Sequence, residues 1–229
     1  MPLERPQRAR FEHSSVLVCF AVRQEATFFS APQPIKGNIR VLLTGMGHKN
    51  AAKTAQRALD DSRPELVLTC GFAGGLKPYL PLGAIVFSAD MDAGLDSILV
   101  ELGAIRAQFH CSTRIASRSV EKRSLWESTR ADAVEMESGV IRQICLERKI
   151  PSATVRAISD TAQQDLPLDF NALMTPGWQI DYRKLLWKLL RRPGTVPALL
   201  AFQRHTKMAA RNLGQSLQEL LRRKYLLTG

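Results

Sequence analysis

The chain has 229 residues, of which 45% are hydrophobic, and it carries a net charge of +11. This length suits one large α/β domain or two small ones, and no apolar run approaches the roughly 18 residues that span a bilayer. The four cysteines form no CxxC pair, which disfavours a zinc site or a disulfide framework. Residues 177–229 hold 11 Lys or Arg against 2 acidic residues, which leaves 21 against 19 elsewhere. This +9 segment suggests contact with an anionic surface.

The first predicted element is a buried strand at residues 16–22. It follows a basic segment, residues 1–10, and the two together resemble a weak signal peptide. The apolar run is short, however, Arg23 follows it at once, and no small-residue cleavage site is evident. We therefore expect a strand, in a protein of the cytoplasm.

Apolar runs and turn residues then alternate as far as Asp160. Further strands are predicted at 39–44, 66–70, 84–88, 132–136 and 153–158, with a candidate strand at 111–116. Helices are predicted at 49–59, 97–102, 119–128 and 138–148. This alternation predicts an α/β fold with a mixed, mainly parallel central sheet flanked by helices.

After Asp160 the sequence changes character. Residues 165–177 resemble a loop, and amphipathic helices follow, with leucines at helical spacing in the stretches 182–190 and 213–221. We expect residues 1–176 to form one α/β domain and residues 177–229 to form a basic helical extension packed on it.

Two glycine turns follow predicted strands. Gly45-Met46-Gly47 precedes a helix, so its backbone N–H groups can meet an anion or a hydroxyl. It lacks the third glycine of a dinucleotide fingerprint and the Lys-Ser/Thr of a P-loop, and an ordinary tight turn is an equal alternative. Gly71-Phe72-Ala73-Gly74-Gly75 allows close backbone approach to a ligand, with a flexible loop and a core Phe72 as the alternative.

Three carboxylates each follow a predicted strand: Glu25, Glu137 and Asp160. The carboxyl ends of strands in an open α/β sheet form its ligand-binding edge. Glutamate is a poor N-cap, so capping explains Glu137 badly. Glu135 lies on the same side of its strand, which leaves a paired-acid arrangement open, and Asp160 can instead organise the loop that follows it. The four histidines lack metal-ligand spacing, so we expect no metal site.

These pieces resemble the nucleoside phosphorylase/nucleosidase superfamily, in the same order, over about residues 15–170. The core is similar to methylthioadenosine/S-adenosylhomocysteine nucleosidases, and the matching stretches are Ala21-Val22-Arg23-Gln24-Glu25, Thr44-Gly45-Met46-Gly47-His48, Thr69-Cys70-Gly71-Phe72-Ala73-Gly74-Gly75-Leu76, Val134-Glu135-Met136-Glu137 and Arg156-Ala157-Ile158-Ser159-Asp160. The resemblance implies a phosphorylase-like three-layer sandwich and cleavage of the bond between a sugar and a purine.

The resemblance also implies roles for single residues. Asp160 would protonate the leaving purine at N7, Glu25 would activate the attacking water, and Glu137 with Met136 would bind the ribose hydroxyls. The transition state has oxocarbenium character, which calls for an acid at the base and a carboxylate near the sugar. The base and its pocket would contact Phe72, Ala73, Gly74, Ser159, Ser119 and Val120. An anion or nucleophile pocket would be formed by Gly45, Gly47 and Arg23.

The resemblance favours water as the nucleophile, with no cofactor. Phosphorylases of the superfamily carry an arginine near the strand end that reads Thr69 here, and the carboxylate of Glu25 would repel phosphate. Phosphorolysis, with phosphate as co-substrate, is the alternative. A non-catalytic nucleoside or nucleic-acid binding protein is an alternative of another class, which the near-neutral charge of residues 1–176 disfavours.

The C-terminal segment carries a second, narrower resemblance. Residues 189–200, which read LLRRPGTVPALL, are similar to hopanoid-associated phosphorylases, which release adenine from an adenosylated triterpenoid lipid. The substrate would then be an adenine nucleoside with a bulky apolar 5′ substituent. The +9 segment could hold the enzyme on an anionic membrane. Alternatively, its leucines pack on the domain or on a second subunit while its basic residues are solvated. We expect a homodimer and no nucleic-acid partner.

Overall fold

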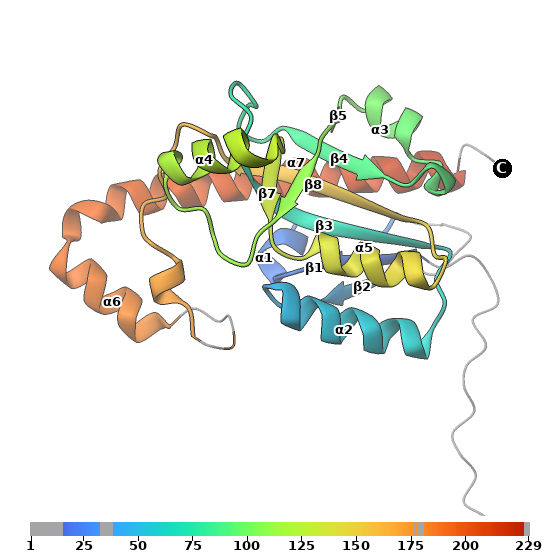
Figure 1. The fold of residues 1–229 in the computed structure, drawn as a ribbon, viewed down its shortest axis with the longest axis horizontal. Coiled ribbons are helices and arrows are strands. Elements are labelled where there is room, and N and C mark those ends of the chain that lie inside the picture. The colour runs from blue at the N-terminus through green and yellow to red at the C-terminus, as the bar shows by residue number, and fades with distance from the viewer. Residues whose placement is uncertain (1–15, 33–38, 176, 178–180, 227–229) are drawn as a thin grey trace, which may run out of the picture.

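A computed structural model describes residues 16–32, 39–175, 177 and 181–226. Its centre is an eight-stranded mixed sheet, with strand order β2-β1-β3-β8-β4-β5 and with β7 pairing to both β3 and β6 (Figure 1). The strands are β1 (Val16–Phe20), β2 (Ile39–Leu43), β3 (Leu66–Gly75), β4 (Ile85–Ala89), β5 (Ile105–Arg106), β6 (Phe109–Cys111), β7 (Ala133–Glu135) and β8 (Ser152–Asp160). The predicted α/β class is confirmed. The basic segment 1–10 lies outside the described residues.

Helices cover both faces of the sheet (Figure 1). They are α1 (Arg23–Ala26), α2 (His48–Asp61), α3 (Asp96–Glu101), α4 (Ser119–Thr129), α5 (Ser138–Glu147), α6 (Tyr182–Arg191) and α7 (Val196–Leu226), with 3₁₀ turns η1 (Met91–Ala93), η2 (Asn171–Leu173) and η3 (Pro193–Thr195). No helix in the described part of the chain is both long enough and apolar enough to cross a membrane.

Successive side chains of a strand point to opposite faces of the sheet, so the core is divided into two layers. Along β1, Val16, Val18 and Phe20 pack with α3 and α7, whereas Leu17 and Cys19 pack with α2 and α5. β8 lies between β3 and β4, and all nine of its residues are buried. A strand buried on both faces is expected to be almost wholly apolar, so the polar residues of β8 need partners within the protein.

The second half of α7 belongs to the core. Leu213, Leu217, Leu220 and Leu221 are buried in the cluster formed by β1, β3 and β8. Gly214 lets the helix approach the chain after α1, because a Cβ at this position would run into the carbonyl group of Phe28. The stretch 213–221, which the sequence predicts to be helical, lies in the second half of this helix.

Three local predictions are wrong. The segment 71–75 is not a strand-end loop: it continues β3 and pairs with β8 and β7. The strand predicted at 111–116 lies earlier, at β6. The strands that precede Glu137 and Asp160 do not end at one carboxyl edge of a parallel sheet, because β7 runs antiparallel to β3 whereas β8 runs parallel to it. Glu137 therefore reaches the centre of the sheet because β7 turns back along β3, and not because parallel strands share an edge.

Candidate active site

Glu25 is buried, although it lies on a helix of only four residues. Its Oε2 accepts hydrogen bonds from the backbone N–H groups of Ala21 (2.9 Å) and Val22 (3.2 Å), and its Oε1 accepts one from Phe72 (2.8 Å). Burial raises the pKa of Glu25, while the charge of Arg156 and the three backbone donors oppose the rise. The carboxylate thus joins the end of β1 to the middle of β3.

Arg156 is the buried cation at the centre of the site. It lies in the middle of β8, and its Nη2 is 2.5 Å from Glu135 Oε2 and 3.7 Å from Glu137 Oε2. Gly71 makes room for this cation, because a Cβ there would collide with both the Arg156 guanidinium and the Glu25 carboxylate. Three carboxylates therefore surround one guanidinium inside the protein.

The two glutamates at the end of β7, Glu135 within the strand and Glu137 after it, have different environments. Glu135 accepts hydrogen bonds from the N–H groups of Glu137 (3.0 Å) and Ser138 (2.7 Å), so it caps the start of α5. Burial would raise its pKa, but Arg156 and these donors hold the pKa of Glu135 below its ordinary value. Burial raises the pKa of Glu137 to about 7, with Arg156 opposing and the charges of Glu25 and Glu135 adding to the rise. The carboxylate of Glu135 is thus used in structural contacts with Arg156 and the start of α5, whereas the carboxyl of Glu137 can change charge near neutral pH.

The first glycine turn reaches Glu137 directly. Gly47 has a left-handed φ of 82° and stands just before α2, and its N–H donates to Glu137 Oε1 over 2.9 Å. Gly45 also has a left-handed φ, of 81°, and its N–H bonds to the carbonyl of Ala21 near Glu25. The structure therefore brings the turn 45–47, Glu25 and Glu137 close together.

Asp160 is the last residue of β8, and it lies beside a cation that the sequence does not predict, Lys122. Its Oδ1 accepts a hydrogen bond from the hydroxyl of Ser159 (2.6 Å), and its Oδ2 is 2.5 Å from Nζ of Lys122, on α4. Gly74 lies beside the carboxyl, 3.2 Å from Asp160 Oδ2 to the position that a Cβ would take. The Asp160 carboxyl thus packs against Gly74 of β3 and forms an ion pair with α4.

The remaining predicted pocket residues divide into two groups. Ala73, Met136 and Ser159 are buried and Phe72 is partly buried, all beside the carboxylates described above. Arg23 and Val120 are exposed, and the N–H of Ser119 is bonded to Asp165 Oδ1 over 2.7 Å. In the structure, α4 therefore contacts Asp160 through Lys122 and not through the residues at the start of the helix.

Sequence reasoning missed Arg156 and Lys122. Arg156 carries a detectable signal, because a charged residue inside an otherwise apolar strand must find partners when the strand is buried. Lys122 carries no such signal, since a lysine on a helix is ordinarily exposed. No group of three or more His, Cys, Asp or Glu within the described ranges is placed to hold a metal ion.

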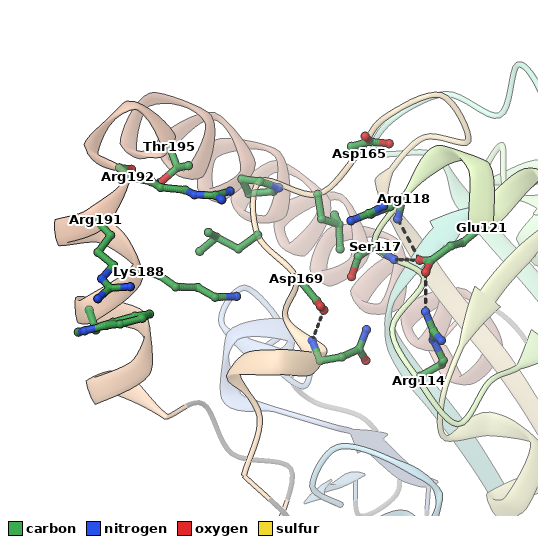
Figure 2. Close-up of a pocket in the computed structure, with 15 residues that line it drawn as sticks. Arg114, Ser117, Arg118, Glu121, Asp165, Asp169, Lys188, Arg191, Arg192 and Thr195 are labelled. Carbon is green, nitrogen blue, oxygen red and sulfur yellow. Dashed lines mark hydrogen bonds and ion pairs between the residues drawn. The ribbon is translucent and has the colours of Figure 1, made fainter.

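A cavity of about 730 Å³ lies between α6 and the loop and helix residues 114–121 and 165–171 (Figure 2). Lys188 and Arg192 extend into it from the C-terminal segment, while Arg118 and Asp169 face them from the body. Arg191 stacks on Trp187, with its guanidinium carbon 3.7 Å from the ring centroid. This cavity is lined mainly by charged groups and is separate from the carboxylates around Arg156.

Known proteins share this fold. A family model described as the phosphorylase superfamily matches residues 34–104 and 102–191. Futalosine hydrolase of Helicobacter pylori superposes with a TM-score of 0.66 at 16% identity, over 91% of this chain and 97% of that one. An S-adenosylhomocysteine nucleosidase of Streptococcus pyogenes gives 0.66 at 13% identity, over 93% and 98%. A methylthioadenosine/S-adenosylhomocysteine nucleosidase of Colwellia psychrerythraea, solved with adenine, gives 0.63 at 17% identity, over 92% and 96%.

Proposed function

Because the chain belongs to the phosphorylase superfamily, we propose that it cleaves the N-glycosidic bond of an adenine nucleoside. The observation that carries the proposal is the set of three buried carboxylates, Glu25, Glu137 and Asp160, each held in a different environment. Cleavage of such a bond needs three separate tasks: holding the sugar, supplying a nucleophile and protonating the base. The similar structures described above are those of nucleosidases and a hydrolase, which supports this reaction class.

In the proposed reaction Glu137 binds the ribose hydroxyls, with Met136 against the sugar. Its carboxyl already accepts one backbone N–H, from Gly47, and has lone pairs left for hydroxyl donors. Since the pKa of Glu137 is about 7, a hydroxyl pair that donates to the carboxylate would favour its charged form. Substrate binding is then coupled to loss of a proton from Glu137.

Glu25 activates the water that attacks C1′. Three backbone donors fix the orientation of its carboxylate, and burial raises its pKa toward the range in which a carboxylate is an effective base. Asp160 serves the opposite end of the reaction, because it lies at the far end of β8 beside Ser159, Gly74 and Lys122. It protonates N7 of the purine as the bond breaks.

Water is the proposed nucleophile because the buried charges leave little room for phosphate. The guanidinium of Arg156 is surrounded by Glu135, Glu137 and Glu25. It cannot bind a phosphate dianion without losing its interactions with these carboxylates. Thr69, at the position where phosphorylases carry an arginine, is buried and bonded to Thr154 (3.0 Å). Phosphorolysis remains the rival, since its chemistry differs only in the nucleophile.

The 5′ substituent is proposed to be large and apolar, such as an adenosylated hopanoid. This finer proposal is supported by the resemblance of residues 189–200 to hopanoid-associated phosphorylases, and by the exposed apolar side chains of α6. A panel of adenosines with hydrogen, methylthio and long alkyl groups at C5′ tests it. We expect kcat/KM to rise with the apolar group, whereas equal or falling values would contradict the proposal.

Adenine release from purified protein, with and without phosphate, tests the reaction. We expect release that does not need phosphate, and a loss of about 100-fold or more in kcat for Asp160→Asn, which removes the acid without changing the shape of the side chain. Release only when phosphate is present would establish the rival. Absence of release from every adenosine in both conditions would overturn the proposed function.

A further inference from the structure

Lys122 is a buried lysine with a complete set of acceptors. Its side chain is 0% exposed, and its Nζ lies 2.5 Å from Asp160 Oδ2, 2.8 Å from the carbonyl of Thr161 and 2.8 Å from the carbonyl of Gln164. An ammonium group carries three N–H donors, so each donor has one acceptor. Lysine is rarely buried so completely, and packing alone would not call for a charged group here.

The same three acceptors also suit the neutral pair. If one proton moves from Nζ to Oδ2, the amine keeps two N–H groups for the two carbonyls. Its lone pair then accepts the new O–H of Asp160. The proton can thus move within the pair without leaving a buried polar atom unsatisfied, which is the step that otherwise makes such transfers costly.

Access to the two groups differs. The Asp160 side chain is 9% exposed, whereas Lys122 is fully covered, so a ligand can touch the carboxyl but not the amine. The other polar groups nearby are the hydroxyl of Ser159, on Oδ1, and two surface charges, Asp165 and Arg118, at the edge of α4. The amine of Lys122 can therefore exchange a proton with a substrate only through the carboxyl of Asp160.

We propose that Lys122 is a positioning residue that supplies the proton which Asp160 delivers to the purine; this rests on the proposed function. In the step, a proton passes from Nζ to Oδ2 and from the carboxyl to N7. The electron pair of the C1′–N9 bond goes to the purine. Water adds its oxygen to C1′ and gives a proton to Glu25. Exchange with solvent then returns a proton to Lys122 and removes one from Glu25.

The test compares two substrates that differ in whether the leaving group needs a proton. Adenine needs a proton to leave, whereas 4-nitrophenolate leaves as an anion, so adenosine and 4-nitrophenyl riboside are compared. We expect Lys122→Met to lower kcat for adenosine by about 100-fold and to change kcat for the nitrophenyl riboside by less than about 5-fold. Equal losses for the two substrates would overturn the proposal, because a merely structural lysine affects both alike.

Two further variants separate the relay from folding and from charge. Lys122→Met with Asp160→Asn leaves no unpaired buried charge, and we expect it to be no slower on adenosine than Asp160→Asn alone. Lys122→Arg keeps the charge but cannot give up a proton, so it should stay slow on adenosine. Additive losses in the double variant, or full activity in Lys122→Arg, would contradict the relay. If wild type itself releases no adenine, the proposed function fails instead.

A second inference comes from the outward face of α6. Tyr182, Leu186 and Leu190 follow one another at four-residue spacing on this helix, and they are 73%, 60% and 74% exposed. The opposite face carries Lys188 and Arg191, which line the cavity toward the body (Figure 2). These three apolar side chains are thus exposed, on a helix that lies to one side of the sheet (Figure 1).

We infer that this apolar face docks on an anionic membrane surface. A helix with one apolar face, a basic opposite face and low mean hydropathy is the kind that lies in a bilayer interface. The occupant follows from charge: residues 177–229 carry +9, so an anionic bilayer attracts this segment, whereas a second copy would bring another +9 to the contact.

Co-sedimentation of the full chain with vesicles tests the inference. We expect at least 10-fold stronger binding to vesicles with phosphatidylserine than to phosphatidylcholine alone, and a loss of at least 10-fold for Leu186→Ser with Leu190→Ser. Leu146→Ser is the matched control, because Leu146 is 70% exposed on α5, in another layer. No binding to anionic vesicles would overturn the inference. So would a dimer in ultracentrifugation that only the α6 variant dissociates, which would assign the face to a second copy.

Discussion

Replacing Glu137 by glutamine should stabilise the protein at alkaline pH while impairing its activity. The pKa of Glu137 is raised by burial from 4.5 to about 7. A raised folded-state pKa means that the folded protein holds this proton more tightly than the unfolded chain. The associated stability is fully present below about pH 4.5 and is lost as the pH rises through 7.

The size of the effect follows from the shift. A rise from 4.5 to about 7 corresponds to about 3 kcal/mol, of which about 2 kcal/mol falls between pH 5.5 and 8.5. Glutamine cannot ionise, and its carbonyl can still accept the N–H of Gly47. Arg156 keeps Glu135 at 2.5 Å, so the guanidinium is not left alone.

Urea unfolding at pH 5.5 and 8.5 provides the measurement. We expect wild type to lose about 2 kcal/mol more than Glu137→Gln between the two pH values, and the variant to be the more stable protein at pH 8.5. Glu127→Gln, an exposed site on α4, should follow wild type. Identical pH dependence in wild type and Glu137→Gln would refute the reasoning. In the proposed reaction the variant also loses a charged acceptor for ribose, worth about 10-fold or more in kcat/KM.

Two further predictions concern stability. Arg156→Met leaves the buried carboxylates without their cation, so we expect a loss of about 3–5 kcal/mol in urea unfolding, larger at pH 8 than at pH 5; a change below 1 kcal/mol would contradict the central role of this arginine. Gly214→Ala places a methyl group against the Phe28 carbonyl, and we expect it to cost about 1–3 kcal/mol. Gly194→Ala has open space around it and should change the free energy of unfolding little, so equal effects at the two glycines would refute the packing explanation.

Strand positions could be predicted from the sequence, whereas strand directions could not. The apolar run of β1 identifies a strand because a strand buried on both faces needs apolar side chains throughout, and shorter apolar runs mark β2, β4 and β8. Direction depends on pairing between distant segments, and the sequence of β7 is equally compatible with either orientation. Gly71–Gly75 resembles a loop because glycine is a poor strand former, yet its close approach to Arg156 and Asp160 requires residues without a side chain.

The carboxylates could be located because their motifs lie at strand ends, but their separate environments depend on two cations. Arg156 is close enough to neutralise Glu135 and is shared with Glu25 and Glu137, so burial leaves these two with raised pKa values. A site of this kind retains protons near neutral pH, because one guanidinium cannot balance three buried carboxylates. The Lys122–Asp160 pair, at the other end of β8, balances its own charges. The protein thus holds a cluster of carboxylates around one arginine and, at the end of β8, a separate buried ion pair, and neither arrangement can be predicted from a single motif.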